Sequence, residues 1–105
     1  MTFQIFMEYK ITEKMIYKYE TGMPSIIKEL ENLGAIDIHW YKAADQGNLY
    51  VEMFILSSME EYETVKRLRR DSDHPVFGKM DEYVDGGMKK VHCWAFVEKS
   101  IENLK

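Results

Sequence analysis

The chain has 105 residues, with 14 basic and 18 acidic side chains and a formal net charge of −4, which predicts one domain spanning residues 1–105. Hydrophobic residues make up 46% and charged residues 30%, a composition typical of folded domains rather than of disordered or membrane-spanning chains. The negative charge disfavours nucleic acid or an anionic membrane as a partner. Cys93 is the single cysteine, and no secretion signal is recognisable, which together predict a cytoplasmic protein.

The first predicted element is a β-strand over Phe3–Ile11, because apolar side chains recur there at every second position. The alternate positions hold Gln4, Phe6, Glu8 and Lys10. This alternation indicates a strand that places one face against a core.

A helix is predicted next, with Thr12 as its N-cap and Gly34 as its left-handed C-terminal residue. Its apolar residues are separated by three or four positions, which defines one helical face: Ile16, Tyr19, Met23, Ile26, Leu30 and Leu33. Pro24 lies inside this stretch, but the apolar spacing continues across it. The pattern therefore favours one kinked helix over two separate helices.

Two further strands, Ile36–Ala43 and Leu49–Leu56, are predicted to form a hairpin around the turn-forming residues 44–48. If the turn is of even length, His39 and Tyr41 pair with Phe54 and Glu52. These pairs would then share one face of the sheet.

The second half of the chain begins with a capping box, in which Ser58 caps a helix and Glu61 reaches back toward it. Met59, Tyr62, Val65 and Leu68 are expected on the inner face of this helix, and Lys66, Arg67, Arg69 and Arg70 on a solvated outer face.

The segment from Asp73 to Pro75 should end that helix and start a short one that runs through Val84. We expect this short helix to act as a lid at one end of the sheet. Gly86 and Gly87 stop it, and the last strand is predicted at Lys90–Val97.

The resulting order, βαββαβ, predicts an α+β domain with the ferredoxin-like fold. Two right-handed crossovers give a four-stranded antiparallel sheet with spatial order 4-1-3-2 and both helices on one face. The other face should then present Phe6, Tyr41, Tyr50, Phe54, Trp94 and Phe96. Because so large an aromatic patch is rarely left in water, we expect a second copy of the chain to cover it, which gives a homodimer.

On these features the sequence resembles the dimeric α/β-barrel superfamily, in particular its NIPSNAP-like and antibiotic-biosynthesis-monooxygenase-like members, over about residues 2–98. The similar segments are Leu33-Gly34, Asn48 before Val51–Phe54, Ser58 with Glu60–Tyr62, Arg69 with Asp71 and Pro75–Phe77, and Trp94–Phe96. The resemblance implies a dimeric barrel, in a fold that hosts oxygenases, haem-degrading enzymes, isomerases and proteins of no known reaction. It does not extend to haem degradation, because the first strand lacks the asparagine of those relatives.

Polar side chains on four predicted strands share the face that would line the barrel: Glu8, His39, Glu52 and His92. In the expected strand order the two histidines lie on opposite edges, roughly 14 Å apart, so one metal ion cannot bind both and we predict no metal site. His92 and Glu8 lie on adjacent strands. They form either an acid/base pair, with His39 as a further base and Tyr41 as a hydrogen-bond donor, or a purely structural ion pair.

The walls of the site would be Phe6, Glu52, Phe54, Trp94 and Phe96, a mixture that suits a small aromatic ligand. Cys93 follows His92 on the same predicted strand, so its side chain should point to the opposite face, toward the helices. It is expected to be a small buried hydrophobic residue. These features indicate a ligand-binding or oxygenase-like protein that uses no cofactor. The alternative is a non-catalytic homodimeric module whose barrel is filled by side chains.

Overall fold

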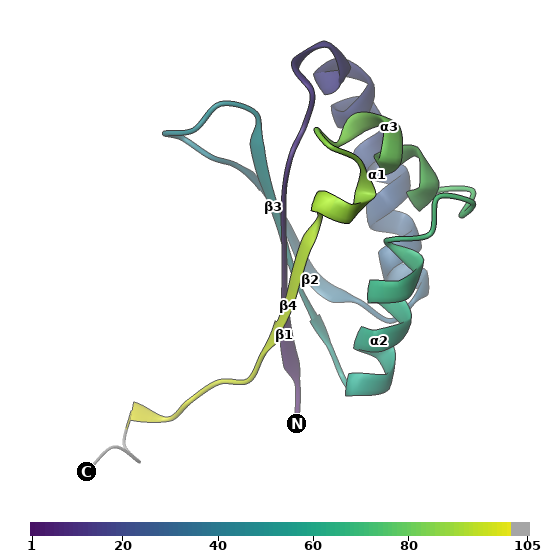
Figure 1. Cartoon of the computed structure of the whole chain (residues 1–105). Helices are drawn as coiled ribbons and strands as arrows, with labels where there is room; N and C mark the ends of the chain where they lie inside the picture. Colours follow the sequence, from purple (N-terminus) through teal and green to yellow (C-terminus); the bar gives the residue numbers. More distant parts are fainter. Residues whose placement is uncertain (102–105) are drawn as a thin grey trace.

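The computed structural model describes residues 1–101, which form one four-stranded antiparallel sheet with all helices on one of its faces (Figure 1). The strands are β1 (Phe3–Lys10), β2 (Ile36–Lys42), β3 (Leu49–Leu56) and β4 (His92–Phe96). Their spatial order is β2-β3-β1-β4. Read from the other edge this order is 4-1-3-2, so the predicted ferredoxin-like topology is confirmed.

The helices are α1 (Ile16–Asn32), α2 (Met59–Leu68) and the single turn α3 (Met80–Tyr83). As expected, α1 continues without a break through Pro24. The predicted cap at Thr12 is wrong, because a 3₁₀ turn at residues 13–15 precedes α1 and the Thr12 side chain makes no capping hydrogen bond. None of the helices within residues 1–101 is long and apolar enough to cross a membrane.

The ends of the two long helices follow the sequence signals. Gly34 terminates α1 with a φ of +103°, a conformation that glycine adopts without steric cost. At the start of α2, Ser58 Oγ accepts a hydrogen bond from the Glu61 backbone N–H at 3.1 Å. The Glu61 carboxylate reaches back to Ser57, whose hydroxyl and backbone N–H donate to it at 2.7 and 2.8 Å, and these bonds lower the pKa of Glu61.

The core lies between the helices and the covered face of the sheet. The strands contribute Ile5, Met7, Tyr9, Tyr50, Phe54 and Leu56 to it, and the helical layer contributes Tyr19, Met23, Leu30, Val65, Phe77 and Met80. All of these side chains are buried. The alternate residues of each strand therefore form a second face that no helix of this chain covers (Figure 1).

The register of the β2–β3 hairpin differs by one residue from the prediction. Lys42 pairs with Tyr50, so the partners of Tyr41 and His39 are Val51 and Met53. The Ala43 N–H donates to Leu49 O at 2.9 Å and closes an odd loop of residues 44–48, in which Asn48 has a φ of +63°. A shift of one residue moves every side chain of a strand to the opposite face.

This shift corrects the predicted positions of Tyr50, Glu52 and Phe54, which lie under the helices and not on the open face. The sequence signal was ambiguous because both sets of alternating residues in β3 are largely apolar. Glu52 was assigned to the open face because Val51, Met53 and Ile55 were expected in the core and an even turn agreed with that choice. Arg69 compensates the charge of Glu52 inside the core.

A β-bulge changes the side of one residue in β2. The register shifts between Ile36 and His39, next to Asp37, whose φ is +53°. Ile36 was expected under the helices, but it pairs with Ile55 and its side chain is 62% exposed. Beyond the bulge, Trp40 faces the helices as expected and donates its indole N–H to Tyr19.

The segment expected to be a lid lies on the helical side of the sheet and packs against α1 (Figure 1). Phe77 and Met80 are fully buried there, so the lid prediction is wrong and the segment belongs to the core. His74 holds its start: its Nδ1 accepts the backbone N–H groups of Val76 and Phe77 at 3.1 and 3.0 Å. Its Nε2 lies 3.3 Å from the Glu29 carboxylate on α1.

Two glycines should respond oppositely to the same substitution. Gly34→Ala should lower the free energy of unfolding by about 1 kcal/mol or more, because its φ is positive and the new Cβ would lie 2.7 Å from the Glu61 carboxylate. Gly22 lies inside α1 with open space around its Cα. Gly22→Ala should therefore raise the free energy of unfolding by about 0.5–1 kcal/mol. Urea denaturation of both variants checks this, and equal effects would contradict the assigned conformation of Gly34.

Candidate functional site

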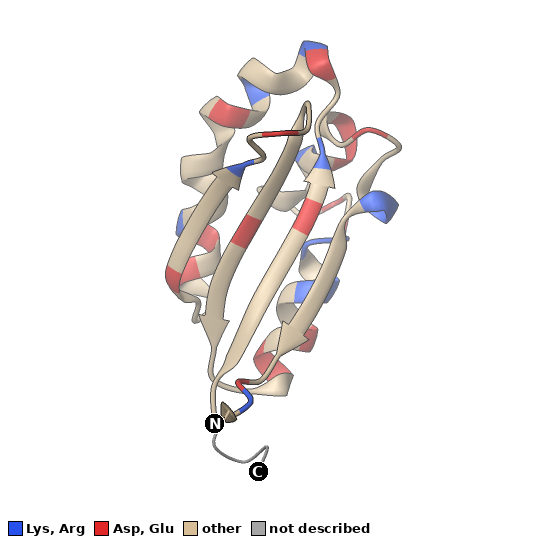
Figure 2. Ribbon diagram, turned by 90° about the vertical axis from the view of Figure 1, so that its left-hand side faces the viewer, with Lys and Arg blue, Asp and Glu red and all other residues tan. Residues whose placement is uncertain are grey.

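The open face of the sheet forms a grid of three rows, each with one residue from every strand. The first row is Tyr41, Val51, Glu8 and His92; the second is His39, Met53, Phe6 and Trp94; the third is Ile36, Ile55, Gln4 and Phe96. The register therefore brings together on one surface Glu8, His39, Tyr41 and His92, together with Phe6, Trp94 and Phe96. Figure 2, which views this side, shows that the strands carry few charged residues and that the helices carry most of them.

The centre of the open face is apolar. Phe6 and Trp94 are neighbours with ring centroids 5.7 Å apart, and Met53 lies beside Phe6 on β3. Trp94 is 42% exposed and Phe96 51%, so both rings present a large area to the outside. Aromatic and aliphatic groups that meet on a flat surface favour contact with another apolar surface or with a planar ligand.

Glu8 and His92 lie directly opposite each other on β1 and β4, as predicted. Their side chains do not form an ion pair within residues 1–101, so the structural alternative to an acid/base pair is not observed. The His92 ring instead stacks on Trp94 at 5.8 Å. Both polar groups line an open hollow of about 210 Å³ with Lys90 and Asp85, which leaves them accessible to a small molecule.

The other two polar residues of the face lie on the edge strand β2. His39 Nε2 lies 3.0 Å from the Asp37 carboxylate, and its ring stacks on Tyr41 at 6.1 Å. Tyr41 is in the same row as Glu8 and His92: β3 lies between Tyr41 and Glu8, and β3 and β1 lie between Tyr41 and His92. The Tyr41 hydroxyl can therefore act on a ligand that spans the sheet at this level.

A buried polar network lies on the opposite, covered face and was not predicted. Arg69, the C-cap residue of α2, donates two hydrogen bonds to the Glu52 carboxylate, at 2.6 and 2.8 Å, and neither side chain is exposed. The Tyr9 hydroxyl also donates to Glu52. It lies 2.6 Å from the Tyr19 hydroxyl, which in turn accepts the Trp40 indole N–H at 2.8 Å.

Arg69 was expected on the solvated face of its helix, and this expectation is wrong. The signal that could have identified it is spacing, because Tyr62, Val65 and Arg69 follow one another at intervals of three and four residues and so share a face. Charge was given more weight than position. A guanidinium group can be buried when a bidentate carboxylate partner is available.

Burial keeps the phenol groups of this network protonated. Desolvation raises the pKa of Tyr9 well above its ordinary value, and the nearby Glu52 charge raises it further. Burial likewise raises the pKa of Tyr19. Both phenols therefore remain neutral donors, and the formal charges of the cluster are those of Glu52 and Arg69, which cancel.

The network is sealed from solvent, which separates it from the candidate site. Arg69 Nε is the one buried side-chain nitrogen or oxygen among the described residues that has no hydrogen-bond partner. Phe77 covers the guanidinium carbon at 5.1 Å. Since no substrate can reach these groups in this conformation, Glu52 joins sheet to helix rather than binding a ligand, and Phe54 is fully buried in the same layer.

Cys93 lies on the covered side of β4, as predicted from its parity, and is partly buried. Burial raises the pKa of its thiol, which disfavours the nucleophilic thiolate. Within residues 1–101, no group of three or more His, Cys, Asp and Glu side chains is arranged to hold a metal ion.

Comparison with solved structures supports the fold. A conserved protein from Methanosarcina mazei is similar with a TM-score of 0.73 and 16% identity over 93% of each chain. SnoaB from Streptomyces nogalater, a cofactor-independent oxygenase, gives 0.72 and 9% over 94% of each chain. A NIPSNAP family protein from Agrobacterium tumefaciens gives 0.69 and 11%, covering 99% of this chain and 91% of that one.

The identities are low, so these similarities establish the fold and leave the activity open. They confirm the predicted resemblance to NIPSNAP-like and monooxygenase-like proteins at the level of the fold. No protein-family model matches the sequence, and no curated protein matches it.

The buried pair should dominate the response of the core to mutation. Glu52→Gln should destabilise the fold by about 3–5 kcal/mol, because it leaves the Arg69 charge buried without a counterion. The double variant Glu52→Leu with Arg69→Met should recover most of that loss, since it removes both charges. Thermal and urea unfolding would measure these effects, and a double variant less stable than the single one would argue against charge compensation.

Proposed function

We propose that this protein is a homodimer that encloses a small aromatic ligand between the open faces of two sheets and oxidises it with molecular oxygen. The observation that carries the proposal is the grid itself, in which an apolar centre adjoins one row that contains His92, Glu8 and Tyr41. Few polar groups among apolar walls are typical of small-molecule sites. The fold shared with SnoaB, described as a cofactor-independent oxygenase, supports this class of reaction.

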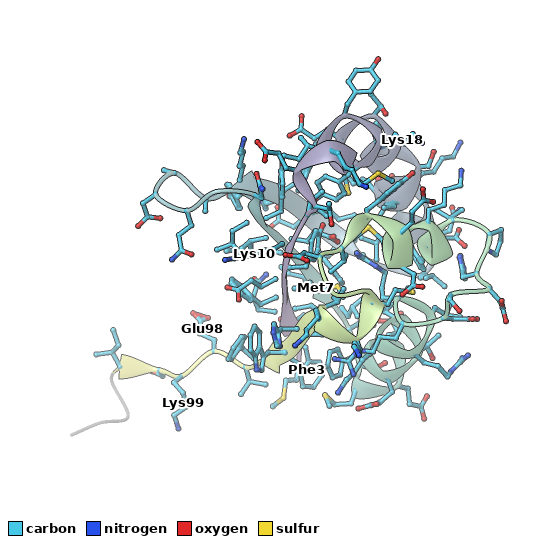
Figure 3. All side chains as sticks on the ribbon, turned by 45° about the horizontal axis from the view of Figure 1, so that its top comes forward. Phe3, Met7, Lys10, Lys18, Glu98 and Lys99 are labelled. Carbon is cyan, nitrogen blue, oxygen red and sulfur yellow. The ribbon has the colours of Figure 1, made fainter. Side chains whose placement is uncertain are left out.

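The shape of the chain supports a second copy as the cover of the open face. The β2–β3 hairpin and the segment after β4 both project beyond the sheet on that side and leave the face between them (Figure 1). Figure 3 shows Glu98 and Lys99 on this segment, away from the helices. Three rows on four strands span roughly 400 Å², and the apolar side chains at their centre favour contact with another apolar surface.

The proposed reaction uses electrons of the substrate. A ring CH₂ or phenol group that forms a stabilised anion loses a proton to the His92 imidazole, and the Glu8 carboxylate on the neighbouring strand balances the charge of the resulting imidazolium. The anion adds O₂ to form a C–O bond, and protonation gives a hydroperoxide. Loss of the remaining C–H proton, with cleavage of the O–O bond and release of hydroxide, gives one water and leaves a carbonyl, so that CH₂ + O₂ becomes C=O + H₂O. Tyr41 donates a hydrogen bond to the oxygen that carries the negative charge.

The competing function is a non-catalytic module in which the two faces fill each other. The large side chains of the second row, Phe6, Met53 and Trp94, favour close packing at the centre of a dimer. The hollow beside Glu8 and His92 instead favours a bound ligand at that end of the open face.

The single cysteine is compatible with a reducing compartment, so a cytoplasmic location remains our prediction.

The dimer is tested by mass in solution. Light scattering after size exclusion should give twice 12.5 kDa, and Met53→Asp should yield a folded monomer, because the charge would lie at the centre of the interface. Tyr17→Asp is the matched control: Tyr17 is 80% exposed on α1 and its substitution should leave the dimer intact. A monomeric wild-type protein would contradict the assembly.

The reaction is tested by oxygen uptake with anthrones and hydroquinones, followed by native mass spectrometry for bound material. His92→Ala should lower kcat/KM by about 10²-fold or more, and Glu8→Gln and Tyr41→Phe by about tenfold each. Cys93→Ala changes the next residue of the same strand, on the opposite face, and should leave turnover unchanged. Binding without oxygen uptake would favour a ligand-binding protein, and neither binding nor uptake would favour the filled barrel.

A further inference from the structure

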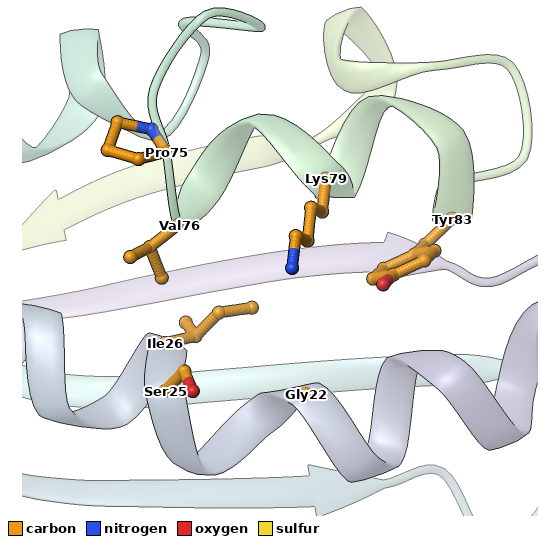
Figure 4. A pocket seen from close by; sticks show the side chains of 7 residues that line it. All are labelled: Gly22, Ser25, Ile26, Pro75, Val76, Lys79 and Tyr83. Carbon is orange, nitrogen blue, oxygen red and sulfur yellow. The ribbon is translucent and has the colours of Figure 1, made fainter.

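A pocket on the helical side of the molecule, separate from the open sheet face, lies between two facing helical surfaces (Figure 4). α1 contributes Gly22, Ser25 and Ile26, and the segment that ends in α3 contributes Val76, Lys79 and Tyr83. Its volume is about 150 Å³, enough for a molecule of a few non-hydrogen atoms. The spacings of three and four residues place each set on one side of its own helix.

Open space lies above Gly22, one of the residues that line the pocket. A Cβ built on Gly22 would meet no atom within 4 Å, so the space above this residue is empty. The walls of the space are held on both sides: His74 contacts Glu29 of α1 at 3.3 Å, and at the other end Tyr83 O accepts the Thr12 N–H at 2.9 Å. The gap is therefore a fixed feature of the packing.

The polar groups at this pocket are donors without partners. Ser25 and Lys79 are exposed at the rim of the pocket, and Ser25 Oγ, Lys79 Nζ and Tyr83 Oη make no hydrogen bond or ion pair with any of the residues described. Ile26 and Tyr83 are buried and supply apolar wall. Figure 4 shows the Lys79 ammonium and the Tyr83 hydroxyl directed into the space between the two helical segments. Lys79 is the one charged residue among those that line the pocket.

We propose that this pocket binds a small organic monocarboxylate. The carboxylate would accept hydrogen bonds from Lys79, Tyr83 and Ser25, which are charge-assisted in the case of Lys79, and its hydrocarbon part would lie above Gly22 between Ile26 and Val76. Inorganic phosphate is also an anion but has no hydrocarbon part to fill the apolar half of the pocket. The size of the pocket selects a short aliphatic acid or a single ring.

The experiment titrates the full chain with butyrate and benzoate and follows amide shifts by NMR. Shifts should centre on Gly22, Ser25, Val76 and Tyr83, with a dissociation constant of about 1 mM, as one charged contact in an open pocket allows. Butyramide and benzamide, which have the same shape without the charge, should bind about tenfold or more weakly, and phosphate should cause no shifts at these residues.

Two variants distinguish the contribution of the Lys79 charge to binding from that of the empty space above Gly22. Lys79→Met should weaken butyrate binding about tenfold or more, and Gly22→Leu should abolish it by filling the cavity. Lys28→Met removes an exposed lysine of α1 that does not line the pocket, and it should leave binding unchanged. Equal binding of butyrate and butyramide, or unaltered affinity in Lys79→Met, would overturn the proposal, as would shifts confined to the open sheet face.

Discussion

The bidentate ion pair between Glu52 and Arg69 is the contact on which the arrangement of the layers depends. It joins the second strand from the sheet edge, β3, to helix α2 in a region from which water is excluded. Two charges in such a place are costly unless each is fully compensated. The pair therefore allows one register of β3 and one rotation of α2, because any other would leave a charge unpaired.

That constraint determines the composition of both faces of the sheet. With Glu52 turned toward the helices, Tyr50 and Phe54 follow it into the core, and Val51, Met53 and Ile55 are left on the outside. The open face thus becomes more aliphatic on β3 than a surface in contact with water normally is. The polar groups that remain there are concentrated in the row that contains Glu8 and His92.

Much of the architecture could be predicted from the sequence, because local signals agreed with one another. The alternation in β1, the helical spacing of α1, the left-handed Gly34 and the cap at Ser58 each located an element correctly. The site was predicted less well. Glu8, His92, His39 and Tyr41 lie on the expected face, but Glu52 and Phe54 do not. The register of the β2–β3 hairpin differs by one residue from the prediction, and this shift turns every side chain of β3 to the opposite face of the sheet.

Two of the errors concern one pair of side chains. Glu52 was placed on the face lining the barrel and Arg69 toward solvent, since an isolated charge is rarely buried. Glu52 and Arg69 violate this rule together, and neither violation is visible from one residue alone. A pair of opposite charges at buried positions of two different elements is a tertiary property. Periodicity along α2 could have located Arg69, but its partner on β3 could not be deduced from local sequence.

The bulge at Asp37 has a consequence for how copies of the chain can associate. It interrupts the regular backbone of β2, one of the two edges of the sheet, while the other edge, β4, has only five residues. Irregular and short edges are poor templates for adding strands from another molecule. Growth of the sheet sideways into a filament is thereby discouraged, whereas in the dimer that we propose the contact through the open face is closed by two copies.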